Sequence, residues 1–165
     1  MQLRRECRVG FEPEIVEAPN VRALYDYWLR LRGKRRFPAK AQIDIADIPH
    51  LAASLMLLRV TYDPLDFEYR IIGDDIVNRL GNMKGRRARD AALLNVDSSA
   101  YRNYCAVVEA GKPQFMAGWA SIPFRPNEPC LLSRVHCPLA ADGETIDHIL
   151  SCVSFSFREP SRAAS

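Results

Sequence analysis

The sequence predicts an α+β fold: a five-stranded antiparallel sheet with inserted helices, preceded by an N-terminal amphipathic helix. Residues 67–71 alternate between apolar and charged side chains, which is the period of a strand with one buried face. The pair Asp142-Gly143 separates two later apolar stretches and is typical of a hairpin turn. Residues 98–110, between these strands, have the spacing of a helix. Strands that precede and follow inserted helices favour the α+β class.

The length and composition fit a single domain. The chain has 165 residues, of which 48% are hydrophobic and 26% are charged, and this balance is typical of a globular protein with a core. Neither repeats nor low-complexity stretches divide it. We expect an N-terminal arm over residues 1–19, one domain over residues 20–158 and a flexible tail over residues 159–165.

Charge, hydropathy and cysteine content argue against a nucleic-acid-binding protein, a membrane protein and a disulfide-bonded protein. The net charge of +3 is small and its sources are spread along the chain, so we expect no nucleic-acid partner. The longest apolar run, residues 51–58, is far shorter than the roughly 20 residues that span a bilayer. No signal-peptide pattern is seen, so we expect a cytoplasmic protein. The five cysteines contain no CxxC pair, which indicates reduced thiols rather than a disulfide framework or a zinc ribbon: Cys7, Cys105, Cys130, Cys137 and Cys152.

The first predicted helix begins at Asn20, which can cap it, and ends at Gly33. Its apolar stripe consists of Val21, Leu24, Tyr25, Trp28 and Leu31. Because so aromatic a stripe is too apolar to stay in water, either the chain's own sheet or a second copy must cover it. We expect a homodimer that uses the stripe as its interface. The basic cluster over residues 30–36 is interpreted as a solvated helix end.

A hairpin is expected next. Residues 43–54 are turn-rich, and the apolar residues 55–60 predict a first strand. Asp63 and Pro64 turn the chain into the second strand, residues 67–71.

A short helix follows the second strand. Gly73 ends that strand, and Asp74 or Asp75 caps a helix that runs to Leu80. Gly81 offers a left-handed exit from it.

The remaining elements are one helix and three strands. The helix over residues 98–110 is followed by Gly111. The strands are expected at residues 114–122, 130–139 and 145–157. The last two are expected to pair as a long hairpin.

Local motifs add a family resemblance to this order. They are Leu24-Tyr25-Asp26-Tyr27-Trp28, Phe37-Pro38, Tyr69-Arg70-Ile71-Ile72-Gly73, the connection from Gly81 to Gly85-Arg86, Gly111-Lys112-Pro113 and Pro138-Leu139. Over most of residues 21–157 the chain resembles the short, single-domain PAS proteins of proteobacteria, with Lys84-Gly85-Arg86 where that family usually has Thr-Gly-Arg. The resemblance implies a sensory role without naming a ligand or cofactor. The Asn-Cys-Arg motif of flavin-binding light sensors is absent, so no covalent flavin photocycle is expected.

Candidate catalytic groups have simpler structural interpretations. Asp74 and Asp75 could share acid-base work, but a helix start explains them better. His136 and Cys137 are neighbours on a strand, so their side chains point to opposite faces and cannot form a dyad. Arg70 is expected to form a structural salt bridge or to anchor a loop carbonyl. We therefore expect no enzyme.

A metal site is possible in the sequence but is not our expectation. His136 and His148 could converge on paired strands with Cys130 or Cys152. Buried thiols and structural histidines are the commoner outcome, so we expect no metal.

A ligand pocket is expected between the sheet and the inserted helices, if the domain binds a small molecule. The candidate residues are Tyr69, Ile71, Tyr101, Tyr104, Cys105, Phe115, Trp119, Val153 and Phe155. These side chains could line a pocket or simply fill a core.

The sequence therefore predicts a sensory or interaction module of bacterial signal transduction. It would bind a small ligand or a partner protein, such as a kinase or another regulator, and signal through an interface because no output domain is seen. The alternatives are a small-molecule-binding protein without a signalling role and an α+β enzyme.

Overall fold

The computed structural model describes residues 7–93 and 98–157. The strands are β1 (Arg8–Gly10), β2 (Leu55–Thr61), β3 (Asp66–Ile72), β4 (Gln114–Ile122), β5 (Arg125–Leu139) and β6 (His148–Phe157). The α-helices are α1 (Pro19–Arg32), α2 (Asp74–Leu80), α3 (Ala88–Leu93) and α4 (Ser98–Ala110). Short 3-10 helices lie at Pro13–Ile15, Lys40–Gln42, Ile45–Asp47 and Pro49–Ser54. The α+β class is confirmed.

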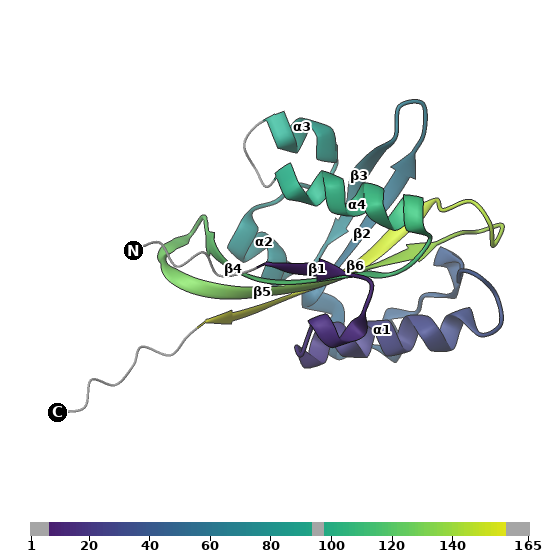
Figure 1. Cartoon of the computed structure of the whole chain (residues 1–165), viewed down its shortest axis with the longest axis horizontal. Helices are drawn as coiled ribbons and strands as arrows, with labels where there is room; N and C mark the ends of the chain where they lie inside the picture. Colours follow the sequence, from purple (N-terminus) through teal and green to yellow (C-terminus); the bar gives the residue numbers. More distant parts are fainter. Residues whose placement is uncertain (1–6, 94–97, 158–165) are drawn as a thin grey trace.

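The six strands form one antiparallel sheet in the order β1-β4-β5-β6-β2-β3. All five expected strands are present, and β5 pairs with β6 as the Asp142-Gly143 turn predicted. The Asp142 carboxylate accepts the backbone N–H groups of Glu144 and Thr145, each at 2.8 Å, which fixes that turn. Helix α1 covers one face of the sheet, and α3 and α4 lie on the opposite side (Figure 1).

The sixth strand, β1, was not predicted. Arg8–Gly10 pair with Phe115–Ala117 of β4 and extend the sheet at one edge. The segment has too few residues for a period to show, so only the partner strand reveals it. Part of the expected arm is thus an edge strand.

A β-bulge corrects the expected burial in β3. Leu57 pairs with Ile71 but Leu58 pairs with Tyr69, so the extra residue Arg70 breaks the alternation. Phe67 and Tyr69 point inward, whereas Ile71 is 57% exposed. The placement of Ile71 in a pocket is therefore wrong.

The N-cap of helix α1 lies two residues earlier than expected. Ala18 is the N-cap residue, without a side-chain cap, and Pro19 is the first helical residue. The prediction that Asn20 caps the helix is wrong. Gly33 ends the helix as expected, at a φ of 55°.

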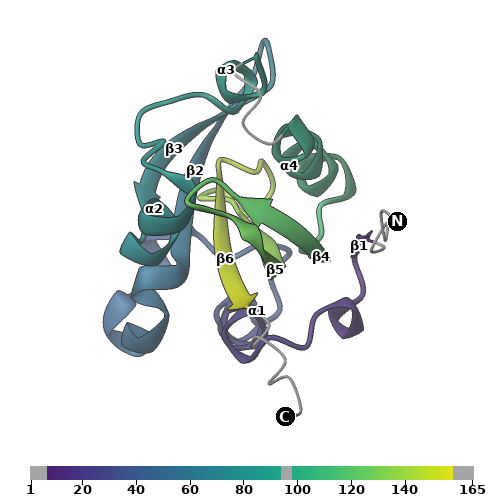
Figure 2. The ribbon, with the colours of Figure 1, turned by 90° about the vertical axis from the view of Figure 1, so that its left-hand side faces the viewer.

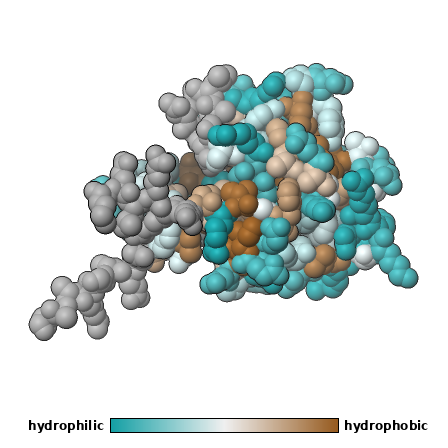
Figure 3. Space-filling view, viewed as in Figure 1, coloured by the Kyte–Doolittle hydropathy of each residue, from teal (hydrophilic) through white to brown (hydrophobic). Residues whose placement is uncertain are grey.

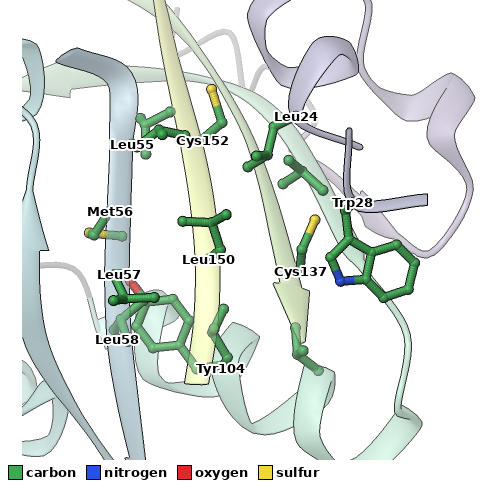
Figure 4. Close-up of a cluster of buried hydrophobic side chains, with 14 of the residues drawn as sticks. Leu24, Trp28, Leu55, Met56, Leu57, Leu58, Tyr104, Cys137, Leu150 and Cys152 are labelled. Atoms are coloured by element: carbon green, nitrogen blue, oxygen red, sulfur yellow. The ribbon is translucent and has the colours of Figure 1, made fainter. Parts of the chain in front are cut away.

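The apolar stripe of α1 is covered by the chain's own sheet. Val21 and Leu24 are fully buried, and Trp28 is 2% exposed. The indole Nε1 of Trp28 donates a hydrogen bond to the Pro138 carbonyl oxygen on β5. Figure 4 shows Leu24 and Trp28 beside Cys137 on that strand.

This docking corrects the predicted dimer interface. Of the five stripe residues, Val21, Leu24 and Trp28 are buried within one chain, and Tyr25 and Leu31 are partly buried against the same core. The intramolecular alternative thus holds for these side chains. The side chains of Val21, Leu24 and Trp28 are therefore not available to a second copy.

Helix α2 begins at a close contact between backbones. Gly73 is the N-cap residue, and neither Asp74 nor Asp75 supplies a side-chain cap. The two carboxylates occupy the first turn instead, where they face the positive pole of the helix. A Cβ on Gly73 would lie 2.3 Å from the carbonyl oxygen of Ala53, so only glycine fits there.

The surface carries scattered apolar side chains. Figure 3 shows a mainly hydrophilic face with a hydrophobic patch near its centre. The exposed large hydrophobic residues are Val9, Phe11, Ile45, Tyr62, Ile71 and Phe124. No described helix is both long enough and apolar enough to cross a bilayer.

Candidate functional site

A cavity of about 460 Å³ lies between the sheet and the helices α2 and α4. In Figure 2, α2 lies at the left, near β2 and β3, and α4 lies at the upper right, above β4. Helix α2, helix α4 and the loop after α2 contribute Ile76, Leu80, Met83, Ser99, Ala100 and Tyr104. The sheet contributes Met56, Tyr69, Met116, Gly118, Trp119, Ala120, Leu132, Arg134 and Val153. Cys7, Ser121, Ile122 and Pro123 complete the lining.

Strand alternation accounts for part of the sheet lining, although Trp119 and Ser121 also border the cavity at the opposite parity. On β4, Met116, Gly118 and Ala120 share one face, and all three border the cavity. Cys7, the residue before the edge strand β1, lies against this side, because a Cβ on Gly118 would lie 3.0 Å from the Cys7 sulfur. A sheet face with small residues next to long ones leaves a hollow that the helices roof over.

Two tyrosines form the polar part of the wall on the α4 side. The hydroxyl oxygens of Tyr69 and Tyr104 lie 3.3 Å apart, at hydrogen-bond distance, and both side chains are buried. The Tyr104 ring also packs on Phe67 and on His136, with ring centroids 5.3 Å and 5.0 Å away. This cluster holds both hydroxyls at fixed positions beside the cavity.

Four of the nine predicted pocket residues border this cavity: Tyr69, Tyr104, Trp119 and Val153. Tyr101 instead packs on Phe67 and donates a hydrogen bond from its hydroxyl to the Leu65 carbonyl oxygen at 3.0 Å. Cys105 is partly buried on α4 and does not border the cavity.

The remaining three predicted pocket residues, Phe115, Phe155 and Ile71, also lie outside the cavity. Phe115 faces α1, where its ring meets the Tyr25 ring edge-on at 5.0 Å. Phe155 has the parity of Val153 but does not border the cavity, and its ring lies beneath the Arg79 guanidinium. Ile71 is turned outward by the bulge.

Sequence reasoning missed most of the other lining residues, and among these Arg134 is a charged one. It lies on β5 directly between Met116 of β4 and Val153 of β6, and it is only 6% exposed. The available signal was a lone arginine within an apolar strand, at the same parity as Leu132 and His136. A charged residue among the core residues of a strand is rare enough to indicate a site.

The comparisons with known proteins identify the family. A family model described as PAS domain matches residues 16–129, more than half of the chain. The chain belongs to the PAS domain family. No curated protein and no solved structure gives a significant match. PAS domains are in general sensory or interaction modules of signal transduction.

The family match covers α1 through β4, and the structure adds the rest of the sheet. Strands β5 and β6 pair along ten residues of each, from Cys130↔Phe157 to Leu139↔His148. They supply Leu132, Arg134 and Val153 to the cavity. The PAS cavity is thus completed by a hairpin outside the matched segment.

Cys137 and Cys152 of this PAS domain are buried in the core. His136 is buried, with its Nδ1 2.7 Å from the Ser151 hydroxyl, whereas Cys137 lies on the α1 face. Burial raises the pKa of Cys137 well above its ordinary value, and it raises the pKa of Cys152 to about 12. Both thiols stay protonated at neutral pH and are poor nucleophiles.

The metal candidates are not brought together. His148 bonds the Asp147 carboxylate at 2.7 Å, and His136 bonds Ser151. Across residues 7–93 and 98–157, no group of three or more His, Cys, Asp or Glu could hold a metal ion.

The charged candidates have structural partners. Arg70 forms a salt bridge with Glu68 at 2.8 Å, as the sequence interpretation of Arg70 predicted. This contact lowers the pKa of Glu68. In the basic cluster, Arg30, Arg32 and Arg36 stack their guanidinium groups over aromatic rings at the end of α1 and just after it.

Proposed function

We propose that this PAS domain is a non-catalytic sensory module that binds a small molecule in the cavity between α2, α4 and the sheet. The cavity itself carries the proposal: its volume of about 460 Å³ falls in the range typical of small-molecule sites, and its lining is mainly apolar. The two tyrosine hydroxyls and Arg134 add a few fixed polar groups, which is how such sites select their ligands.

The signal is proposed to travel through β5 and β6 to α1. Arg134 and Val153 face the cavity, whereas Cys137 and the Pro138 carbonyl lie against α1. Because successive residues of one strand face opposite sides, a displacement of β5 by a ligand reaches α1 directly. The output is a change in how the outer surface docks a second copy or a partner regulator in the cytoplasm.

A thermal-shift screen with a cavity-filling variant tests ligand binding. Ala120 borders the cavity on the same face as Met116 and Gly118, so Ala120→Phe places a ring inside it. Metabolites that bind the cavity should raise the melting temperature of the wild type and not that of Ala120→Phe. Circular dichroism first checks that the variant is folded. If no compound distinguishes the two proteins, the proposal is wrong.

Signalling needs a separate measurement. Native mass spectrometry of the purified protein, with and without a compound found in the screen, shows bound mass and oligomeric state together. A ligand-dependent change in self-association or in capture of a regulator supports the sensory role. Binding without either change would instead indicate a small-molecule-binding protein with no signalling role.

A further inference from the structure

The small net charge of the chain hides an asymmetry in where the charges lie. Residues 27–43, at the end of α1 and in the segment after it, contain no Asp or Glu. They contain six basic residues, which we call the basic end: Arg30, Arg32, Lys34, Arg35, Arg36 and Lys40. Taking these six from the 23 Lys and Arg residues leaves 17 against 20 Asp and Glu residues, so the rest of the chain is net negative.

The basic end is not neutralised within the part of the chain that the structure describes. Over residues 7–93 and 98–157, none of its six side chains forms an ion pair with a carboxylate. Arg30 and Arg32 lie in the last turn of α1, where the negative pole of the helix favours them. That effect does not extend past the last turn, so it does not account for the exposed side chains of Lys34, Arg36 and Lys40. Like charges so close together repel, and an anionic partner would relieve the repulsion.

Three guanidinium groups of the basic end are held in place by aromatic rings. Each lies within 5.3 Å of the centroid of a ring that is at most 2% exposed. A guanidinium held in this way loses little freedom when it binds, and its fork of N–H donors matches the two oxygens of a carboxylate. The pairs are Arg30 over Tyr27, Arg32 over Trp28 and Arg36 over Phe37.

A hollow of about 330 Å³ opens beside Arg36. The segment after α1 and the loop between β5 and β6 lie at the same end of the molecule, and both contribute to this hollow (Figure 1). Tyr62 is 46% exposed there, and its hydroxyl donates a hydrogen bond to the Ile146 carbonyl oxygen at 2.7 Å, which fixes the ring at the rim. Val108 and Ile146 add apolar surface, and Glu144 adds one negative charge. The hollow therefore offers a recessed apolar surface next to fixed cations.

This combination favours an acidic protein segment over other anions. A membrane surface is bound by apolar side chains that protrude, whereas those of the hollow are recessed. A nucleic acid carries a charge at every step of its backbone, so Glu144 would repel it. A peptide can place an apolar side chain in the hollow and keep its carboxylates on the cations around it.

We propose that the basic end, together with the hollow beside Arg36, docks an acidic segment of a partner protein. An apolar side chain of that segment enters the hollow, and flanking Asp or Glu carboxylates bind the guanidinium and ammonium groups. This inference goes beyond the proposed ligand site, because it assigns a surface and a partner chemistry that need no ligand in the cavity.

Fluorescence anisotropy with matched probes tests the class of partner. The first probe is a fluorescein-labelled peptide with one leucine between two runs of glutamate. The others replace its leucine by serine or its glutamates by lysines, and a single-stranded oligonucleotide and phosphatidylserine vesicles represent the other anions. At about 0.15 M salt the leucine peptide should bind most tightly, about fivefold more tightly than the serine peptide, and the lysine peptide should not bind.

Charge-reversal variants assign the binding to the basic end. Lys34 and Lys40 are exposed, and in the described chain neither side chain forms a hydrogen bond or an ion pair, so Lys34→Glu and Lys40→Glu leave the fold intact. Each should weaken the leucine peptide about tenfold. Lys84→Glu is the matched control, because it makes the same change of charge at an exposed lysine in the loop after α2. It should change the affinity less than about twofold.

Each other outcome overturns the proposal or a stated part of it. Tighter binding of the oligonucleotide or the vesicles would assign the surface to that class of anion instead. An equal loss in Lys84→Glu and Lys34→Glu would show that the peptide follows net charge alone. Equal binding of the serine and leucine peptides would remove the hollow from the site. Because no cavity ligand is present, this test and the thermal-shift screen can fail independently, and the wild-type probe series decides the class even if a variant does not fold.

Discussion

The indole Nε1 of Trp28 donates a hydrogen bond across 2.8 Å to the carbonyl oxygen of Pro138, and both groups are buried. This bond ties α1 to the strand whose other face borders the cavity. Because water does not reach the buried carbonyl oxygen of Pro138, loss of the indole donor leaves that oxygen with one hydrogen bond fewer.

Replacement of Trp28 by phenylalanine should therefore destabilise the domain. Trp28→Phe keeps an aromatic ring but removes the donor, so the free energy of unfolding should fall by about 2 kcal/mol. Urea unfolding followed by circular dichroism measures it. Asp26→Ala is the control, because Asp26 is exposed on the same helix, and its effect should stay below about 0.5 kcal/mol. An equal effect of both variants would contradict the docking of α1.

A charge in the stripe should unfold one chain rather than separate two. Leu24 is fully buried against the chain's own core, so Leu24→Glu places a carboxylate where it cannot be hydrated. We expect a protein that loses its cooperative unfolding transition. Sedimentation together with circular dichroism distinguishes this result from a folded monomer, which is what an intermolecular stripe would give.

This contrast shows how far the sequence could predict the fold. Periodicity and the Asp142-Gly143 turn located the strands and helices that have enough residues to show a pattern. The sequence could not decide what covers Leu24 and Trp28, because an apolar stripe has the same spacing whether its partner is the same chain or a second copy. It also missed β1, which has three residues, and the bulge at Arg70, which depends on the partner strand.

The candidate site was predicted less well than the fold. Alternation placed Tyr69 and Val153 at the cavity, but a single register error moved Ile71 to the surface. Phe115 was assigned by parity to the wrong face, since the two faces of a fully covered sheet are equally apolar. Arg134 was passed over because only the neighbouring strands show that it lies on the cavity floor.

The contact at Gly73 should make that position intolerant of a side chain. Its φ of −67° suits any residue, so the obstacle is the Ala53 carbonyl oxygen, 2.3 Å from where a Cβ would lie. Gly73→Ala should cost about 3 kcal/mol of unfolding free energy. Gly143→Ala is the comparison: its φ of 79° strains alanine, but the space is open, and a cost of about 1 kcal/mol is expected. A smaller loss at Gly73 than at Gly143 would contradict the close approach of the two backbones.

The buried Cys152 thiol should make stability depend on pH in the alkaline range. Burial raises its pKa from 9.0 to about 12 in the folded protein, so between these values the unfolded chain loses the proton first. The stabilising effect is complete below pH 9 and disappears as the pH rises through the folded pKa. Unfolding free energies of the wild type should therefore fall more steeply than those of Cys152→Ala, by at most about 1.4 kcal/mol per pH unit.

Two controls isolate the Cys152 effect. Cys7→Ala is the control for the loss of a cysteine as such, because Cys7 is exposed. Cys152→Ala also leaves a small void, which lowers stability at every pH without changing the slope. Parallel curves for the wild type and Cys152→Ala would show that this thiol ionises equally in both states.

The most direct test of the cavity is methyl NMR of the protein labelled at methionine and isoleucine methyl groups, titrated with N-phenyl-1-naphthylamine. Met56, Met83 and Met116 border the cavity, and so does Ile76, whereas Ile71 is exposed on the outer side of β3. The account predicts that the four cavity methyl signals shift together with one saturation curve while the Ile71 signal stays in place. Shifts at Ile71 without shifts at the three methionines would place binding on the surface and contradict a ligand site between α2, α4 and the sheet.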